Sequence, residues 1–167
     1  LPAGLDGLYL GGGYPELYAA QLSENRSMCS SVRAALEAGL PCIAECGGFM
    51  YLTEAIGEHP MVGFLPGRCF DAGKLARFGY VALTAERDNL LCRAGGSIPA
   101  HEFHHWDSTA NGVALAAKKP VGGAEWRCGF IDEHFYAGFP HLYWAGTALP
   151  RRFVDAAAHY HQEEQDQ

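Results

Sequence analysis

Short apolar runs alternate with helical patterns over the first 60 residues. The apolar runs end at glycines, as buried strands in a sheet commonly do. Pro15 can open the first helix without losing a hydrogen bond, because an N–H is unpaired at that position anyway. The expected elements are strands at 6–10 and 42–45 and helices over 15–22, 26–38 and 49–56. This order predicts a parallel sheet covered by helices.

From residue 61 onward the pattern changes to strands separated by Gly, Pro or Asn turns. We expect strands at 61–65, 78–84, 98–106, 113–117, 125–130 and 135–137, with a hairpin connection over 131–134. An amphipathic helix over 151–161 follows Pro150, and the polar tail 162–167 is expected to fray. The predicted fold is one α/β domain, residues 1–167, with a mixed, mostly parallel sheet flanked by helices and an antiparallel insertion.

Composition narrows the classes of function. A chain of 167 residues with 49% hydrophobic residues can bury the core of one globular domain. Its formal net charge of −7 argues against nucleic acid or an anionic membrane as a partner. No apolar run approaches the roughly 18 residues that a membrane span needs.

The six cysteines contain no Cys-x-x-Cys pair, and a core-rich chain does not need a disulfide framework. Reduced thiols in the cytoplasm are therefore expected. The sequence starts at Leu1 without a methionine and runs almost at once into a strand. We therefore expect one domain of a longer protein.

One stretch, residues 41–52, combines a short apolar run, a cysteine, two glycines and a helical pattern. A strand, a sharp turn and a helix form a nucleophile elbow, which exposes a reactive side chain above a sheet. The free N–H groups at the helix start favour a thiolate at Cys46. The alternative is a small buried cysteine at a tight turn. The full context favours a catalytic Cys46.

A catalytic cysteine needs a base, most often histidine. Among eight histidines, His141 directly follows a predicted strand, and the active site of an open α/β sheet lies at such strand ends. A structural role for His141 is the alternative.

Attack on a carbonyl also needs N–H donors for the oxyanion. The N–H of Gly47 follows the nucleophile, and the bare backbone of Gly12 and Gly13 can supply a second donor. The same glycine turn could instead cradle phosphate. However, it matches neither Gly-x-Gly-x-x-Gly nor the P-loop, so the signal for a nucleotide is weak.

The run His101-Glu102-Phe103-His104-His105 has the spacing of a zinc metalloprotease motif. That motif binds zinc only on a helix, where both histidines share one face. Gly95, Gly96, Pro99 and the aromatic residues around it favour a strand instead, with alternating faces. We therefore predict no metal site.

Several motifs together resemble the glutamine amidotransferase domain of cobyrinate (or hydrogenobyrinate) a,c-diamide synthases. They fall in the family's order and cover nearly the whole chain. They are Leu10-Gly11-Gly12-Gly13-Tyr14-Pro15-Glu16, Ala44-Glu45-Cys46-Gly47-Gly48-Phe49-Met50-Tyr51-Leu52, Arg77-Phe78-Gly79-Tyr80, His101-Glu102-Phe103-His104 and Phe139-Pro140-His141-Leu142.

The resemblance implies a class I glutaminase that passes ammonia to an N-terminal, ATP-dependent synthetase domain. In the family that domain uses ATP and Mg²⁺ to activate the a and c acetate carboxylates of a corrinoid. The present sequence, residues 1–167, carries neither a P-loop nor an acidic metal cluster. The resemblance therefore implies no cofactor here, with ATP and Mg²⁺ belonging to the full-length enzyme.

Residue by residue, the resemblance implies that Cys46 is the nucleophile and His141 its base. It places Glu102 and His104 near the glutamine or the domain interface. Two positions depart from related sequences: Tyr143 stands where many class I enzymes have a glutamate, and Pro140 where this family tends to have leucine. The carboxylate that orients His141 is thus either missing or supplied from elsewhere.

Two alternatives remain open. A related amidotransferase, serving cobyric acid synthase or a cell-wall amidating enzyme, would share the chemistry but not the acceptor. A non-catalytic docking module would lack glutaminase activity altogether.

Overall fold

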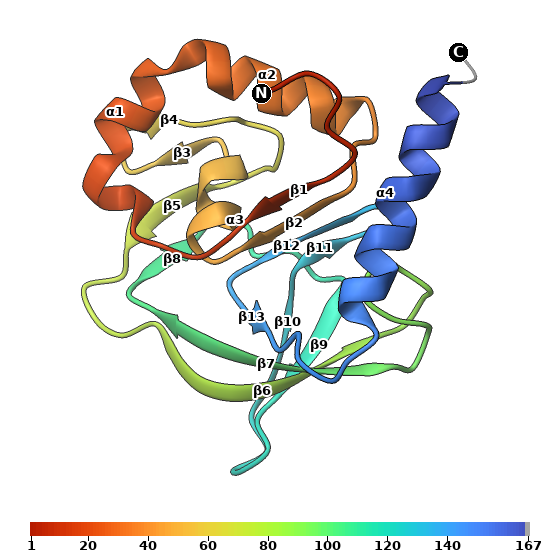
Figure 1. Cartoon of the computed structure of the whole chain (residues 1–167). Coiled ribbons are helices and arrows are strands. Elements are labelled where there is room, and N and C mark those ends of the chain that lie inside the picture. The colour runs from red at the N-terminus through yellow and green to blue at the C-terminus, as the bar shows by residue number, and fades with distance from the viewer. Residues whose placement is uncertain (166–167) are drawn as a thin grey trace.

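A computed structural model describes residues 1–165, apart from the side chain of residue 164. It is an α/β structure with three sheets (Figure 1). The helical elements are the 3-10 helix η1 (Pro15–Tyr18), α1 (Ala19–Glu24), α2 (Arg26–Glu37), α3 (Gly47–Leu52) and α4 (Leu149–Gln165).

The first sheet is mixed, in the order β1-β2-β12-β11. Its strands are β1 (Leu8–Leu10), β2 (Cys42–Glu45), β12 (Phe135–Gly138) and β11 (Phe130–Ile131). The central strand β2 is parallel to both β1 and β12, while β11 is antiparallel to β12. The carboxyl ends of three parallel strands therefore meet at one edge, where an α/β sheet places its site.

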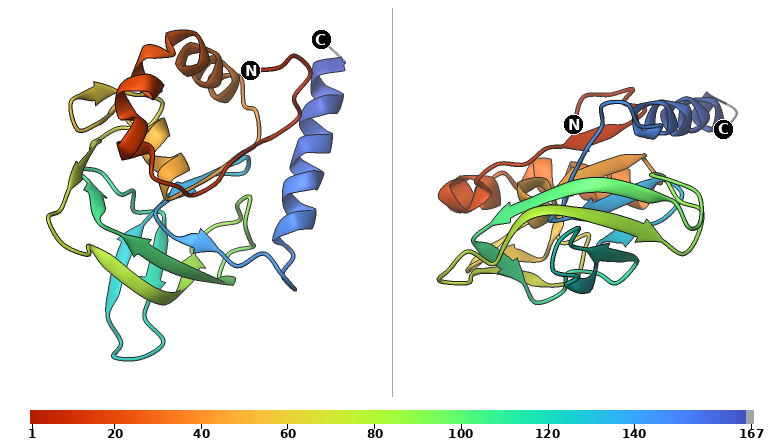
Figure 2. Two further views of the ribbon diagram at one scale, coloured as in Figure 1. Left: turned by 60° about the vertical axis from the view of Figure 1, so that its left-hand side comes forward. Right: turned by 90° about the horizontal axis from the view of Figure 1, so that it is seen from below.

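The second sheet is antiparallel, in the order β10-β9-β6-β7-β13, and forms a layer of its own (Figure 2). Its strands are β10 (Glu125–Cys128), β9 (Leu115–Lys118), β6 (Arg77–Ala85), β7 (Ser97–His104) and β13 (His141–Leu142). A third, small sheet contains β4 (His59–Pro60), β3 (Ala55–Ile56), β5 (Arg68–Asp71) and β8 (Trp106–Ser108).

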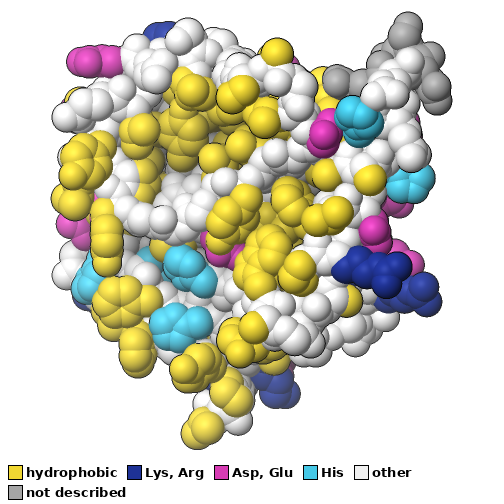
Figure 3. Space-filling model, viewed as in Figure 1, with side chains coloured by type: hydrophobic (Ala, Val, Ile, Leu, Met, Phe, Trp, Pro, Cys, Tyr) yellow, Lys and Arg dark blue, Asp and Glu magenta, His cyan; other side chains and the backbone are white. Residues whose placement is uncertain are grey.

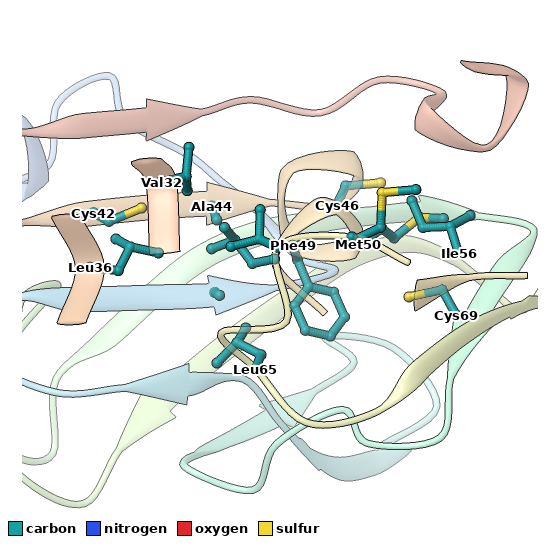
Figure 4. Packing of buried hydrophobic residues seen from close by; sticks show 14 of the residues in the cluster. Val32, Leu36, Cys42, Ala44, Cys46, Phe49, Met50, Ile56, Leu65 and Cys69 are labelled. Atoms are coloured by element: carbon teal, nitrogen blue, oxygen red, sulfur yellow. The ribbon is translucent and has the colours of Figure 1, made fainter. Parts of the chain in front are cut away.

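The mixed sheet separates two hydrophobic clusters, because successive strand residues point to opposite faces. Cys42 and Ala44 belong to the cluster that contains α2 and α3 residues, as Figure 4 shows for Val32 near Cys42. Ile43 and Tyr136 belong to the other cluster, with the antiparallel sheet. Burial on both faces explains why the run 42–44 is apolar without alternation.

The two longest helices add to these clusters. In α2, the Asn25 side chain accepts the backbone N–H of Met28 (3.2 Å) as an N-cap, and Val32 is buried. In α4, Leu149 is buried in the second cluster and Phe153 packs against it. Within residues 1–165 no helix combines the length and apolar character needed to cross a membrane.

The α/β class and most elements are as predicted, but the sheet arrangement differs. Parallel pairing is limited to the β1-β2-β12 part of the first sheet and to the pair β3–β5 of the small third sheet. The antiparallel part is a larger, five-stranded sheet. The expected strand 125–130 divides at Gly129, whose φ of 74° turns the chain from β10 into β11 of the other sheet. The strand 98–106 similarly divides at His105 into β7 and β8.

Two predictions around α3 are wrong for one reason. The helix begins at Gly47, earlier than expected, and ends at Leu52, where the Thr53 side chain bonds the Met50 carbonyl (2.7 Å). Residues 61–65 form no strand, because their backbone N–H groups bond the carbonyls of residues 51–54. They satisfy the free acceptors that the end of a helix leaves.

Two helical predictions also change. The segment 15–22 starts as the 3-10 helix η1 before α1. The tail expected to fray is helical through Gln165, and residues 166–167 lie outside the described part. The ring of His161 in this helix lies 2.8 Å from the carboxylate of Asp6, which ties the end of α4 to the first segment.

Replacing Ile43 by alanine tests the contact between the sheets. Ile43 is fully buried (0% exposed) between the mixed and antiparallel sheets, so we expect the free energy of unfolding to fall by about 2–5 kcal/mol. The control Val121→Ala, at a side chain 86% exposed, should change it by less than about 0.5 kcal/mol. Urea denaturation measures both, and equal effects would contradict this packing.

Candidate active site

Cys46 lies on the sharp turn between β2 and α3, as the sequence predicts. Its φ of 50° and ψ of −105° make it the one non-glycine residue in the described chain with positive φ. The backbone holds this strained turn, since its N–H donates to the Gly138 carbonyl (2.8 Å) and its carbonyl accepts from Met50 (2.9 Å). Strain of this kind concentrates at functional sites, and here it defines the elbow.

The glycines on both sides of the elbow allow two backbone segments to touch. A Cβ on Gly48 would lie 2.2 Å from the Leu10 carbonyl oxygen, and one on Gly47 would lie 2.9 Å from that of Gly13. The Gly48 N–H also donates to the Gly11 carbonyl (3.1 Å). The glycine turn after β1 therefore lies directly on the elbow, as an oxyanion site would require.

His141 begins β13, which pairs with β7 opposite His101. A Cβ on Gly12 would lie 2.3 Å from Cε1 of the His141 ring, so the ring rests on this glycine. The structure therefore brings Cys46, Gly47, the glycine turn and His141 to one place. Among the contacts of the described residues, no hydrogen bond joins the Cys46 sulfur to His141.

The environment of Cys46 favours the thiol. Burial, with 7% of the residue exposed, raises its pKa to about 11. A hydrogen bond from the Gly47 N–H lowers the pKa in part, while the carboxylates of Glu16, Glu45 and Glu102 raise it. The prediction of a thiolate at Cys46 is therefore wrong. Desolvation raises the pKa by more than the Gly47 N–H, at the start of a six-residue helix, lowers it.

His141 is shifted in the opposite direction. Burial lowers the pKa of its imidazole below the usual 6.5, Glu45 counteracts this, and His101 and His104 lower it further. A lowered pKa leaves the ring neutral at pH 7. Figure 3 shows histidine and hydrophobic side chains gathered on this face, with Lys and Arg toward its edges. Cys46 and His141 are thus both uncharged at neutral pH.

Glu45, which immediately precedes Cys46, is the functional candidate that the sequence reasoning missed. It is 3% exposed, and its Oε1 accepts the backbone N–H of Leu142 (3.0 Å) and the indole N–H of Trp144 (3.3 Å). Its Oε2 accepts the Tyr9 hydroxyl (2.8 Å) and lies 3.9 Å from Nδ1 of His141. The sequence signal that could have identified Glu45 is a charged residue at the end of an otherwise apolar strand.

The two departures from related sequences have different surroundings. Tyr143 is 59% exposed and puts no carboxylate beside His141, so the charged neighbour comes from β2 instead. The carbonyl of Pro140 accepts the hydroxyl of the buried Tyr136 (3.0 Å), which anchors the backbone just before His141.

Glu102 and His104 are buried beside the His141 segment, at 1% and 5% exposure. Nδ1 of His104 lies 2.6 Å from the Trp106 carbonyl, and the ring stacks on Phe139 with centroids 3.9 Å apart. Its Nε2 lies 3.8 Å from Glu102, without a hydrogen bond. Their proposed contact with glutamine or a domain interface stays a prediction.

The segment with zinc-protease spacing is a strand through His104, as predicted. Burial alternates along it: His101 is half-buried, Glu102 is buried and Phe103 is exposed. In the part of the chain that the structure describes, no group of three or more His, Cys, Asp or Glu side chains is arranged to hold a metal ion.

Residues 1–148 match the family model of the CobB/CobQ-like glutamine amidotransferase domain. The chain belongs to this family. The match covers the glycine turn, the Cys46 elbow and His141 of this amidotransferase domain.

Three curated relatives of this amidotransferase domain carry the name cobyrinate a,c-diamide synthase. The one from Caldanaerobacter subterraneus is 37% identical over 96% of this chain and 37% of its own length. The one from Clostridium acetobutylicum is 39% identical (88% and 35%), and that from Methanosarcina acetivorans is 44% identical (93% and 36%). The chain thus spans little more than a third of these relatives.

Gly12→Ala tests the contact between the glycine turn and the base. The added methyl group must displace the His141 ring, so we expect glutamine hydrolysis to slow by about a hundredfold. The matched control is Gly11→Ala, whose Cβ meets the Tyr9 ring at an ordinary 3.4 Å and should react at close to the unaltered rate. Steady-state glutaminase assays compare the two, and equal rates would contradict this contact.

The raised pKa of Cys46 predicts its reactivity. Iodoacetamide is neutral and reacts with thiolates, so its rate at Cys46 should rise about tenfold per pH unit between about pH 7 and 9. Mass spectrometry of the Cys46 peptide follows the reaction. A plateau near pH 8 would mean that the thiolate forms far more easily than this burial allows.

Proposed function

We propose that this domain hydrolyses glutamine at Cys46 and supplies the ammonia for ATP-dependent a,c-diamidation of cobyrinate or hydrogenobyrinate. The observation that carries the proposal is the strained Cys46 elbow, packed against a bare glycine turn that also touches His141. A nucleophile, a base and free backbone donors are the parts that acyl transfer needs.

In the first half-reaction the Cys46 sulfur attacks the side-chain carbonyl carbon of glutamine while His141 takes the thiol proton. The N–H of Gly47, with that of Gly12 or Gly13, holds the resulting oxyanion. The carbon–nitrogen bond then breaks, His141 returns its proton to nitrogen, and ammonia leaves. A thioester between Cys46 and the glutamyl group remains.

In the second half-reaction His141 accepts a proton from water, whose oxygen attacks the thioester carbon. The carbon–sulfur bond breaks, and the proton returns to the sulfur. Glutamine and water have become glutamate and ammonia, with the thiol and imidazole restored.

A neutral resting pair fits this sequence of proton transfers. The raised pKa of Cys46 keeps its proton in place until a substrate is attacked, and the lowered pKa of His141 keeps the ring free to accept it. The N–H of Gly47 lowers the pKa of the thiol in part, so it stabilises negative charge on the sulfur as the proton leaves.

The larger reaction rests on the relatives, whose printed name is cobyrinate a,c-diamide synthase. We infer that the domain has the class I amidotransferase arrangement, with the sheet flanked by helices. We also infer that it acts in the cytoplasm and forms the C-terminal part of a longer synthetase. Its partners are glutamine, an N-terminal synthetase domain and the corrinoid that this domain amidates. ATP and Mg²⁺ belong to that synthetase domain, and this domain needs no cofactor of its own.

Cys46→Ala tests the nucleophile. It should abolish glutaminase activity and also labelling by an electrophilic glutamine analogue, because the sulfur that forms the covalent bond is gone. The control is Cys92→Ala. Cys92 is more exposed than the other five cysteines, so labelling governed by exposure alone would disappear there instead.

Persistent glutaminase activity in the full-length Cys46→Ala protein would overturn the assignment. A domain that only docks would give no selective label at Cys46 in the unaltered protein. Assaying ammonia transfer to cobyrinate, cobyric acid precursors and cell-wall precursors separately would show whether another ligase is the true destination.

A further inference from the structure

Glu45 joins three parts of the site that are far apart in the sequence. It ends β2 directly before Cys46, it accepts the Tyr9 hydroxyl at the middle of β1, and it binds the segment that follows His141. A buried carboxylate is costly unless its oxygens accept hydrogen bonds, and three donors satisfy this one. Burial raises the pKa of Tyr9 to about 12, so that donor keeps its proton at neutral pH.

The two oxygens of Glu45 have different tasks in this geometry. Oε1 is occupied by the two N–H donors of the 142–144 segment, which fixes that backbone relative to β2. Oε2 is held by Tyr9 and faces Nδ1 of His141 at 3.9 Å. The carboxylate is thus held firmly beside one nitrogen of the ring.

This placement matters at the moment of proton transfer. When His141 takes the thiol proton, its neutral, half-buried ring becomes a cation. A fixed carboxylate at 3.9 Å stabilises that cation, and a proton on Nδ1 directed at the carboxylate leaves Nε2 free as the acceptor. A carboxylate beside the base has the same effect in other nucleophile–histidine sites.

We propose that Glu45 is the positioning residue of His141, supplying from the strand before the nucleophile the carboxylate that position 143 lacks. It acts through the imidazole and does not touch the substrate. This inference rests on the proposed function, in which His141 is the base for Cys46.

Glu45→Gln separates positioning from simple packing. Glutamine keeps the shape and an acceptor for Leu142 and Trp144 but removes the charge. We expect kcat for glutamine to fall about tenfold or more with KM nearly unchanged.

The pH profile gives a second readout. Glu45 and Glu102 raise the pKa of His141, while burial, His101 and His104 lower it. Removing the Glu45 charge lowers this pKa further, so the acid limb of the kcat profile, where the base becomes protonated, should move to lower pH. Glu45→Asp keeps a charge and should return the limb toward its original position.

The matched control is Tyr9→Phe, which removes a hydrogen bond to the same Oε2 but leaves the charge near His141. Its acid limb should not move to lower pH. If Glu45→Gln and Tyr9→Phe lose kcat equally with no movement of either limb, Glu45 serves only packing and the proposal fails.

Two further outcomes are decisive. Unaltered kcat and pH profile in Glu45→Gln overturn the role of Glu45 yet leave the proposed function standing, whereas persistent activity in Cys46→Ala overturns the function itself.

Should Glu45→Gln fail to fold, nitrogen NMR of the His141 ring in the unaltered protein tests the role of Glu45. A proton on Nδ1 supports the proposal, and a proton on Nε2 at neutral pH contradicts it.

Discussion

Close contact between two stretches of bare backbone is the constraint on which this site depends. The two glycines of the elbow leave no room for a side chain: a Cβ on Gly48 would lie 2.2 Å from the carbonyl oxygen of Leu10, at the end of β1, and one on Gly47 would lie 2.9 Å from that of Gly13. The parallel strands β1, β2 and β12 bring the glycine turn and the elbow to the same edge of the sheet. Without that contact, the ring of His141 would have no surface to rest on.

A second constraint is electrostatic. Burial raises the pKa of Cys46 and lowers that of the half-buried His141, so both rest without charge. In the proposed reaction the charges are therefore created only during the proton transfer, where fixed dipoles and a fixed carboxylate stabilise them more than water would. A helix start contributes to this through the Gly47 N–H, but burial decides the protonation of the sulfur.

Local patterns predicted what depends on neighbours along the chain. A strand pattern followed by two glycines predicted the turn at Cys46. Runs of strand-forming residues between turn residues predicted β6 and β7. His141 could be chosen among eight histidines because a strand precedes it. The family resemblance supplied glutamine as substrate, which no residue pattern could give.

The rest depends on contacts between distant segments. Residues 61–65 have the composition of a strand, yet their N–H groups bond the end of α3. Glu45 looks like the end of an apolar strand, and its partners lie 36 and 97 residues away at Tyr9 and Leu142. Separations of this size leave no periodic signal, so neither feature could be predicted from the sequence alone.

The burial of Cys46 also affects how readily its thiol is oxidised. Peroxides attack thiolates that solvent can reach, and sulfinic and sulfonic products are not reversed by ordinary reductants. Cys46 is 7% exposed and its pKa is raised to about 11, so its thiol is a poor target for that damage. The same burial that raises the pKa of Cys46 therefore protects its thiol from oxidation.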